Sequence, residues 1–371
     1  MSWISRTTPA GRRTSLAASA LVLGALAAGL TACGSSDDSA GSAGSAGDAP
    51  ASGGSGSASL GSISVQLSWI KNSEFAGEFI ADSKGYYKDA GFSSVDLVKG
   101  PVATETLVAS GKATFGLSNA VSTATAIANS GAPLKIVGTT YQKNPFTILS
   151  LADKGNITTP QDMIGKKIGV QDSNASLFDA LLKANGIDKS QVTVVPVGYD
   201  PSVLEQGQVD GYVGYLTNEA LIVKGDGYKI TNLPFADNGL PFVAESVITT
   251  DQEIKDHPDV VKGFLQAEIK GWKDACNGSA GYKAGAQLAV DDYGKDEKLT
   301  LSKEIEQAQE QCQQLINTDE TKKNGLFTIS DDMVRANMDT LKAAGITISA
   351  DQLFDLGPLT ELLKEQPDLA K

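Results

Sequence analysis

The sequence predicts an α/β protein of two lobes, in which the second lobe is inserted into the first and a helical segment follows. Three observations predict this class. Short apolar strand patterns alternate with helical patterns and Gly-containing turns, which is typical of mainly parallel sheets covered by helices. The alternation restarts after Leu151, which indicates a second lobe. From Gln252 onward the pattern is predominantly helical.

The elements of the first lobe follow from the spacing of apolar residues between turns. Alternating or continuous apolar runs predict strands at 63–67, 95–98, 114–117 and 134–140. Apolar residues at three- and four-residue spacing predict helices at 75–87, 104–110 and 122–129.

The second lobe repeats this alternation. The same criteria predict strands at 167–170, 192–197, 211–215 and 229–232. Helices are expected from Thr159 and at 176–184 and 203–206, and the C-terminal region is expected to contain helices at 264–276, 302–316 and 353–363.

Two crossings between the lobes define the expected domains. They are placed near Leu149–Leu151 and Glu245–Ile248, which assigns 62–150 and 247–371 to lobe one and 151–246 to lobe two. Ligands of such sheets bind outside the carboxyl ends of the strands, in the cleft between lobes.

The N-terminus predicts export and lipidation. Arg6, Arg12 and Arg13 precede a short apolar stretch that ends in small residues before Cys33, so residues 1–32 are expected to be a signal peptide and not a spanning helix. The residues before Cys33 resemble a bacterial lipobox, whose cysteine receives a lipid. An ordinary secretory signal with an incidental cysteine is the alternative, and the Arg pair leaves Sec and twin-arginine export both open.

A flexible tether is expected after Cys33. Residues 33–61 are nearly all Ser, Gly and Ala and have no aromatic side chain, so they cannot bury enough apolar surface to fold. They could carry the folded body toward a membrane partner or only span a cell wall. The protein is therefore expected to be anchored to the outer face of the cytoplasmic membrane, with a soluble and monomeric body.

Composition excludes several function classes. The chain of 371 residues has 44 acidic and 31 basic side chains and a formal net charge of −13, which argues against a nucleic-acid partner. A single histidine, His257, excludes a multi-His metal site and leaves a triad mechanism only one base. No metal or cofactor is expected, and binding is favoured over catalysis.

Two further cysteines lie in the C-terminal helical region. Cys276 and Cys312 belong to helix-like segments of an exported body, where thiols oxidise, so a disulfide between packed helices is expected. Two separate buried thiols are the alternative.

A longer motif resembles a known family. Trp69–Gly77, continuing to Ala81–Gly91, is similar to the opening of substrate-binding proteins of ABC importers for nitrate, sulfonates and thiamine-pyrimidine precursors, above all the last branch. Three shorter segments, 108–111, 165–170 and 207–211, also match, and 214–219 resembles the pyrimidine-precursor branch. The resemblance spans roughly residues 63–345, and its first motif is the most specific.

The resemblance implies a fold and a function. The expected fold is a bilobal clamshell like that of type II periplasmic binding proteins, and the expected partners are a small ligand and a membrane permease. The branch also includes enzymes that synthesise the thiamine pyrimidine and carry a Cys-rich motif near the position of 214–219. That segment has no cysteine here, so the enzyme interpretation is disfavoured.

Loops at the strand ends supply the candidate ligand-binding residues. They are aromatic or neutral-polar with one acid and no Arg, which suits a flat heterocycle better than an anion. The set comprises Trp69, Asn72, Phe75, Ser118, Asn119, Tyr141, Ser173, Asn174, Tyr215, Asn218 and Glu219.

Several of these residues have simpler interpretations. Trp69 and Phe75 could belong to the core, Ser173 and Asn174 could cap a helix, and Glu219 could be a helix-start acid. In the binding interpretation, Glu219 accepts two hydrogen bonds from the exocyclic amine of a thiamine-type pyrimidine. Riboflavin is the alternative ligand, followed by sulfonate or nitrate. Ligand-driven closure of the lobes, without any bond being made, is the expected mechanism.

Overall fold

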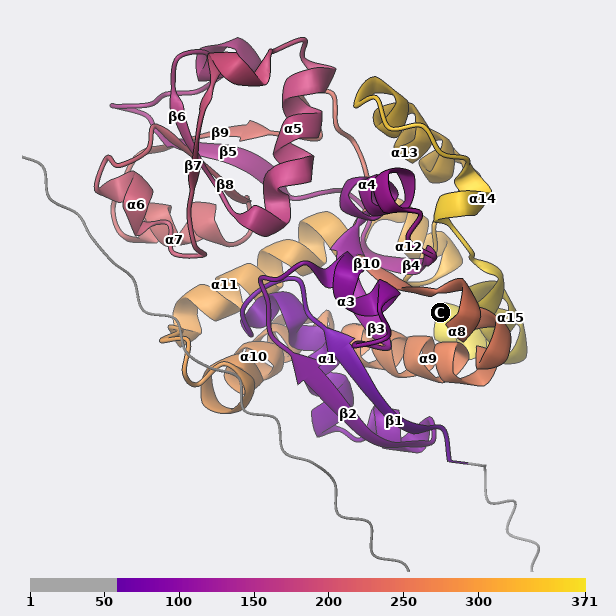
Figure 1. Ribbon diagram of the computed structural model, residues 1–371. Coiled ribbons are helices and arrows are strands. Elements are labelled where there is room, and N and C mark those ends of the chain that lie inside the picture. The colour runs from indigo at the N-terminus through magenta and orange to yellow at the C-terminus, as the bar shows by residue number, and fades with distance from the viewer. Residues whose placement is uncertain (1–58) are drawn as a thin grey trace, which may run out of the picture. The chain divides into compact units, whose positions relative to one another are not determined.

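Residues 59–371 are described by the computed structural model of the protein, which contains two five-stranded sheets (Figure 1). Both sheets belong to one compact unit, Gly56–Lys371. The expected signal peptide, the expected lipidation site at Cys33 and almost all of the expected tether lie outside the described residues.

The first sheet, sheet A, has the strand order β2-β1-β3-β10-β4. Its strands are β1 (Gly61–Gln66), β2 (Phe92–Val98), β3 (Phe115–Asn119), β4 (Leu134–Tyr141) and β10 (Ala244–Thr250). β1 runs parallel to β2 and β3, whereas β10 runs antiparallel to β3 and β4.

The second sheet, sheet B, has the strand order β7-β6-β8-β5-β9. Its strands are β5 (Phe146–Leu151), β6 (Lys167–Val170), β7 (Thr193–Pro196), β8 (Gly211–Tyr215) and β9 (Ile230–Pro234). β6 runs parallel to β7 and β8, whereas β5 runs antiparallel to β8 and β9.

The chain changes sheet twice. It leaves β4 at Tyr141 and enters β5 at Phe146, and it leaves β9 at Pro234 and returns in β10 at Ala244. The sheets are therefore mixed rather than mainly parallel, because β5 and β10 enter their sheets without the helical crossover that a parallel neighbour requires. Both connections precede the lobe boundaries expected from the sequence, and the division at 150/151 and 246/247 stays a prediction.

Helices surround both sheets (Figure 1). They are α1 (Ala76–Ser83), α2 (Tyr86–Asp89), α3 (Thr104–Ala109), α4 (Ala120–Ser130), α5 (Ala175–Ala184), α6 (Ser202–Glu205), α7 (Glu219–Gly225), α8 (Asp251–Asp256), α9 (Pro258–Ala275), α10 (Gly278–Leu288), α11 (Leu301–Gln311), α12 (Asp319–Asn324), α13 (Asp331–Ala343), α14 (Ala350–Leu353) and α15 (Gly357–Glu365). Short 3-10 helices include η1 (Ser73–Phe75) and η3 (Asp172–Asn174), and a π-helical turn, η6 (Cys312–Ile316), extends α11. Over residues 59–371, none of the helices is both long enough and apolar enough to cross a bilayer.

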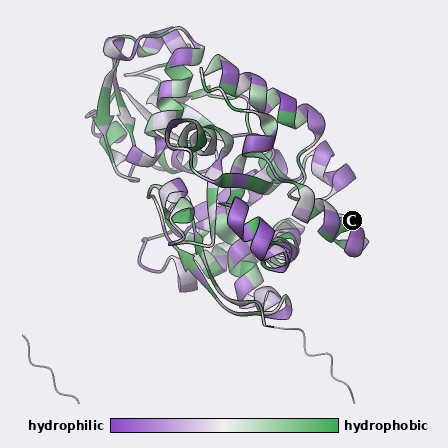
Figure 2. Ribbon diagram, turned by 45° about the vertical axis from the view of Figure 1, so that its right-hand side comes forward, coloured by the Kyte–Doolittle hydropathy of each residue, from purple (hydrophilic) through white to green (hydrophobic). Residues whose placement is uncertain are grey.

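The core lies between the strands and the inner sides of the helices. The strands carry much of the hydrophobic colour in Figure 2, and several outer helices alternate hydrophilic and hydrophobic residues. Helices α1 and α9 approach closely because glycines face each other. A Cβ atom at Gly77 would lie 2.3 Å from the ring of Trp272, and one at Gly271 would lie 2.2 Å from the Gly77 carbonyl oxygen.

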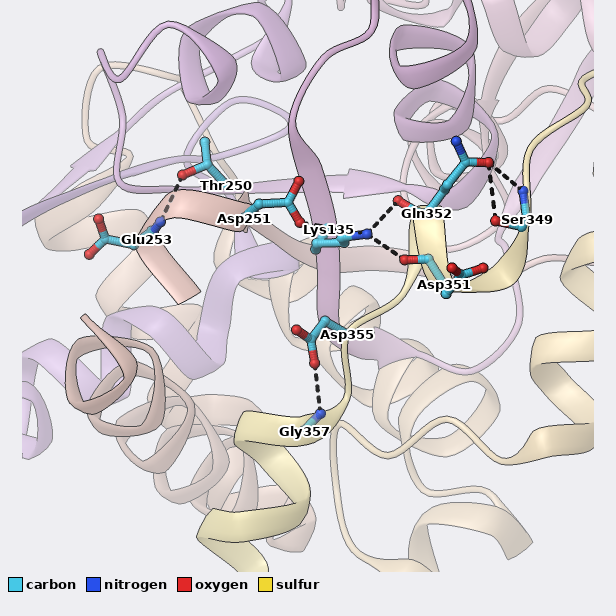
Figure 3. Close-up of polar contacts among 9 residues, drawn as sticks. All are labelled: Lys135, Thr250, Asp251, Glu253, Ser349, Asp351, Gln352, Asp355 and Gly357. Atoms are coloured by element: carbon cyan, nitrogen blue, oxygen red, sulfur yellow. Dashed lines mark hydrogen bonds and ion pairs between the residues drawn. The ribbon is translucent and has the colours of Figure 1, made fainter. Parts of the chain in front are cut away.

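The C-terminal segments are fastened to β4, an edge strand of sheet A (Figure 3). The ammonium group of Lys135 donates hydrogen bonds to the backbone oxygens of Asp351 and Gln352 at the end of α14, and lies 3.6 Å from the Asp251 carboxylate. Ile136 of the same strand forms a bridge to Phe354. The C-terminal return thereby covers an edge that would otherwise expose unpaired backbone groups.

A disulfide joins two of the C-terminal helical segments. Cys276, which ends α9, and Cys312, which begins η6, are bonded, with their Cα atoms 5.4 Å apart. The structure therefore pairs the two cysteines and does not leave them as separate thiols.

Candidate functional site

A cavity lies between the two sheets, at the carboxyl ends of their parallel strands. It has an empty volume of about 540 Å³, including the space at its open mouth, and we refer to it as the inner cavity. Residues of both lobes line it: Ser68, Trp69, Glu74, Val102, Thr104, Glu105, Leu117, Ser118, Asn119, Ser122, Phe146, Ser173, Asn174, Val213, Gly214, Tyr215, Glu219 and Glu245. Its position matches the cleft that α/β sheets of this kind use for ligands.

Glu245 reaches the inner cavity because β10 is interrupted at this residue. The ladder between β10 and β3 shifts register between Ala244 and Ser246, and Glu245 has a φ of +45°, in the left-handed region. A bulge redirects a side chain, and left-handed backbone at a non-glycine residue is uncommon and often found at functional sites. The Glu245 side chain is only 3% exposed.

Two hydroxyl groups hold the Glu245 carboxylate. Ser68, which follows β1, lies 3.1 and 3.0 Å from its two oxygens and donates from Oγ. Tyr215, at the end of β8, donates from its hydroxyl to Oε1 at 3.0 Å. Because Tyr215 belongs to sheet B and Glu245 to sheet A, this second hydrogen bond crosses the cleft.

Glu74 places a second carboxylate beside Glu245. It lies in η1, whose start is capped by the Asn72 side chain accepting a hydrogen bond from the Glu74 amide at 3.1 Å. The Glu74 side chain is 1% exposed, and its Oε1 atom lies 3.2 Å from the same Ser68 hydroxyl. Its Oε2 atom is buried without a hydrogen-bond partner.

Burial and proximity perturb the titration of these acids. Burial, followed by the charge of Glu245, raises the pKa of Glu74 well above its ordinary value. Burial also raises the pKa of Glu245 to about 7. Two carboxyl groups this close and this dry do not both ionise at neutral pH, so the pair retains a proton.

Glu219 supplies a third carboxylate from the first turn of α7. Its Oε2 accepts from the Tyr215 amide at 2.7 Å and its Oε1 from the Asn218 side chain at 3.2 Å. Burial raises the pKa of Glu219 to about 7. Both oxygens thus already have local partners, which makes Glu219 less available to a ligand amine than the sequence suggested.

The sequence-predicted residues fall into three groups. Seven line the inner cavity: Trp69, Ser118, Asn119, Ser173, Asn174, Tyr215 and Glu219. Asn72 and Asn218 line an adjoining hollow, the outer cavity, which shares Trp69 and Glu219 with the inner one and has an empty volume of about 1090 Å³ including the solvent space at its mouth. Phe75 and Tyr141 reach neither cavity: Phe75 packs edge-on against Phe79, and the Tyr141 hydroxyl donates to Gln311 at 2.8 Å in the interior.

The predicted asparagines also serve the local structure. Asn119 accepts hydrogen bonds from the amides of Val121 and Ser122 and so caps α4. Asn174 forms no capping bond with α5, and its side chain donates to Gln171 at 2.9 Å instead.

Sequence reasoning missed Ser68, Glu74 and Glu245, the residues that form the acidic centre of the inner cavity. Glu74 lies within the Trp69–Gly77 motif. Glu245 is a charged residue in a largely apolar run, and this pattern could have indicated a functional residue. Sequence reasoning also missed Phe146, an aromatic residue of the cavity lining. Its ring packs edge-on against Tyr215, with ring centroids 4.6 Å apart.

Two sheets with a cavity between them have counterparts among solved structures. The periplasmic nitrate-binding protein NrtA from Synechocystis PCC 6803 superposes with a TM-score of 0.60 at 11% identity, covering 84% of this chain and 91% of that one. The chain therefore has the fold of periplasmic binding proteins, as its sequence predicted.

The chain belongs to the "NMT1/THI5 like" family, which matches residues 72–278. It is similar to the riboflavin-binding protein RibY of Chloroflexus aurantiacus, with 27% identity over 58% of this chain and 63% of that protein. It is also similar to a 4-amino-5-hydroxymethyl-2-methylpyrimidine phosphate synthase of Uromyces fabae, with 28% identity over 58% of this chain and 67% of that protein. The chain thus matches about two thirds of the length of these relatives.

Proposed function

We propose that this protein is the extracytoplasmic substrate-binding component of an ABC importer. It captures a small heterocycle between its lobes and delivers it to a membrane permease without making or breaking a bond. The observation that carries this proposal is the inner cavity, which both sheets line and which the Tyr215–Glu245 hydrogen bond spans. The family and the fold support the same function.

A thiamine-type pyrimidine fits the chemistry of the inner cavity. Trp69 and Phe146 offer aromatic surfaces for a flat ring. The carboxyl groups of Glu74 and Glu245 can accept hydrogen bonds, as the exocyclic amine of an aminopyrimidine requires.

Riboflavin is the second candidate, favoured by the outer cavity. Its isoalloxazine ring needs more space than a pyrimidine and its ribityl chain needs polar partners. The outer cavity adjoins the inner one at Trp69 and Glu219 and contains polar side chains such as Asn72, Thr217 and Asn218. The similarity to RibY supports this alternative.

Anionic ligands suit the inner cavity poorly. Its described lining contains four glutamates and no Lys, Arg or His, whereas nitrate and sulfonates are bound by cationic side chains or by several free amides. An enzyme that synthesises the pyrimidine is the alternative from another class, given the synthase relatives. Turnover of a pyrimidine by the purified protein would favour that enzyme.

Closure would occur at the two connections between the sheets. Ser150 and Ser246, which lie at the two crossings expected from the sequence, are fully buried within β5 and β10 and are poor positions for bending. The connections 142–145 and 235–243 change sheet outside the strands and can absorb a backbone rotation.

The lipid anchor on Cys33 belongs to the same proposal, since a tethered binding protein stays near its permease. Full-length protein and its Cys33→Ser variant should separate on cell fractionation, with the first in the membrane fraction and the second released. Equal membrane retention of both would contradict lipidation at Cys33.

Thermal unfolding of the full chain in detergent tests the ligand class. The panel contains 4-amino-5-hydroxymethyl-2-methylpyrimidine, its aminomethyl analogue, thiamine, riboflavin, taurine and nitrate. A ligand present at ~100 times its dissociation constant stabilises the folded state by about 2.7 kcal/mol, which raises the melting temperature by several degrees. A shift with a pyrimidine or riboflavin supports the proposal, and a shift with taurine or nitrate alone contradicts it.

A further inference from the structure

The Glu74–Glu245 pair has more carboxyl oxygens than hydroxyl groups that donate to them among the described residues. One Ser68 hydroxyl, which carries a single proton, lies within hydrogen-bond distance of both Glu74 and Glu245. Within residues 59–371, the other side-chain hydroxyl that donates to Glu245 is that of Tyr215. Whichever carboxylate Ser68 serves, the other lacks that donor.

The shortage is greatest at Glu74. This side chain lines the inner cavity, is almost completely buried, and leaves its Oε2 atom without any partner among the described residues. A buried carboxyl oxygen without a partner is costly, and the proton that the Glu74–Glu245 pair retains lowers the cost of burial without supplying the partner that a ligand would. The unpartnered oxygen is therefore a second observation, independent of the clustering of acids, that points to a ligand.

The charge of the lining agrees with the hydrogen-bond count. Glu74, Glu105, Glu219 and Glu245 all line the inner cavity, and no basic side chain lies among the described residues that do so. Trp69 and Phe146 add aromatic surfaces, whose negatively polarised faces attract cations. Polarity, charge and aromatic surface thus all favour a cationic ligand that carries hydrogen-bond donors.

Building on the proposed function, we propose that the inner cavity binds its ligand as an organic cation, with N–H donors directed at the Glu74–Glu245 pair. The two carboxyl groups act together as the counter-ion for an ammonium or amidinium group, while the rest of the ligand lies against Trp69 and Phe146. Glu219, whose oxygens are both occupied, has a smaller part in this recognition.

A proton should leave when such a cation binds. The titratable groups around Glu245 are Glu74 from η1, Tyr215 from β8, Glu219 from α7 and Tyr141 from β4, and none of them is basic. In the empty protein the Glu74–Glu245 pair retains a proton, because ionising both groups without a counter-ion is unfavourable. A bound cation stabilises the doubly ionised pair, so the retained proton moves to solvent.

Calorimetry with matched probes tests this inference. The probes are 4-amino-5-aminomethyl-2-methylpyrimidine, which carries an ammonium group, and its 5-hydroxymethyl analogue, which lacks one. Propane-1,3-diamine is a cation without a ring, taurine and nitrate are anions, and Ca²⁺ and Zn²⁺ are metal cations. Titrations of the full chain in two buffers of different ionisation enthalpy also measure the protons released.

The variants separate the acidic pair from buried carboxyls in general. Glu245→Gln and Glu74→Gln each remove one member of the pair. Glu78→Gln is the matched control, because Glu78 belongs to another buried carboxyl pair, with Glu268, and does not line the inner cavity. Thermal unfolding of each variant shows whether it is folded.

The inference predicts that the aminomethyl probe binds about tenfold or more tightly than the hydroxymethyl probe and releases a proton. Glu245→Gln and Glu74→Gln should each weaken its binding by about tenfold or more, whereas Glu78→Gln should not. Equal or tighter binding of the hydroxymethyl probe, unchanged binding in both pair variants, binding of an anion, or binding of a metal cation alone would each overturn it.

The same titrations separate this inference from the proposed function. Binding of propane-1,3-diamine, with no binding of either pyrimidine or of riboflavin, would sustain a cation site and refute heterocycle capture. Preferential binding of the uncharged pyrimidine or of riboflavin would sustain heterocycle capture and refute the cation site. Absence of binding by every probe would overturn both.

Discussion

The hydroxyl of Tyr215 donates a hydrogen bond of 3.0 Å to Oε1 of Glu245 and thereby joins sheet B to sheet A across the inner cavity. Another link crosses between the lobes at Lys303 of α11, which forms an ion pair of 2.7 Å with Asp226 beside α7. The two differ in kind, because Tyr215 and Glu245 also line the site. A residue pair that lines a cavity and also holds the lobes together is expected to couple ligand binding there to closure.

Tyr215→Phe should therefore weaken ligand binding while leaving the fold intact. The ring still packs against Phe146, but the closed arrangement of the lobes loses its hydrogen bond across the inner cavity, and a hydrogen bond to a charged group is worth about 1.5–3 kcal/mol. We expect calorimetry to show affinity reduced by about tenfold or more. Tyr228→Phe, at an exposed tyrosine, is the control, and equal affinities of the two variants would contradict the bridging role.

Stability should fall as pH rises, because buried acids are protonated in the folded protein. Glu78 of α1 and Glu268 of α9 form a pair between these two helices, where Trp272 donates to Glu78 at 3.3 Å and Tyr87 donates to Glu268. Burial raises the pKa of Glu78 well above its ordinary value and that of Glu268 to about 7.

The sign follows from these upward shifts. A raised folded-state pKa leaves stability complete below the unfolded value of about 4.5, and stability is lost as pH rises through about 7. The melting temperature should therefore decrease from about pH 5 to about pH 8. Glu268→Gln should flatten this slope, as should substitutions at Glu74 and Glu245, whose pKa values are shifted in the same direction. A melting temperature that rises over this range would contradict the assignment.

The Cys276–Cys312 disulfide should contribute substantially to stability. It closes a segment with a sequence separation of 36 residues, and crosslinks of this size typically stabilise a protein by about 2–5 kcal/mol. The double variant Cys276→Ser, Cys312→Ser should melt at a lower temperature than the oxidised protein, and a reductant should lower the melting temperature of the native protein alone. No difference between oxidised and reduced protein would refute this contribution.

Gly77→Ala should damage the packing of α1 on α9. The added methyl group would lie 2.3 Å from the Trp272 ring, so the helices must separate, at a cost of about 1–3 kcal/mol or more. Gly198→Ala is the control, because nothing lies within 4 Å of a Cβ atom at that exposed position. Urea denaturation should show a lower midpoint for the first variant only, and equal midpoints would contradict the close contact.

The sequence predicted the regular elements well and the acidic centre poorly. Strands β6 and β8 begin and end where apolar residues between turns placed them, because both are short buried strands with Gly or Lys at their boundaries. Strand β5 was expected only as part of a crossing, since its residues are buried on both faces and show no alternation.

The position of Glu245 could not be predicted from periodicity. A bulge and a positive φ depend on the pairing of β10 with its neighbours, and strand patterns do not report either. The same limit applies to Glu74, because its partner Glu245 lies beyond the whole of the second lobe in sequence. Only the folded chain brings the two carboxyl groups together.

A crystal structure of the protein with 4-amino-5-aminomethyl-2-methylpyrimidine tests the central claim most directly. The account predicts the ring in the inner cavity against Trp69, with its amine nitrogens within hydrogen-bond distance of Glu74 or Glu245. Ligand bound at another place, or an inner cavity still empty at saturating ligand concentrations, would contradict the account.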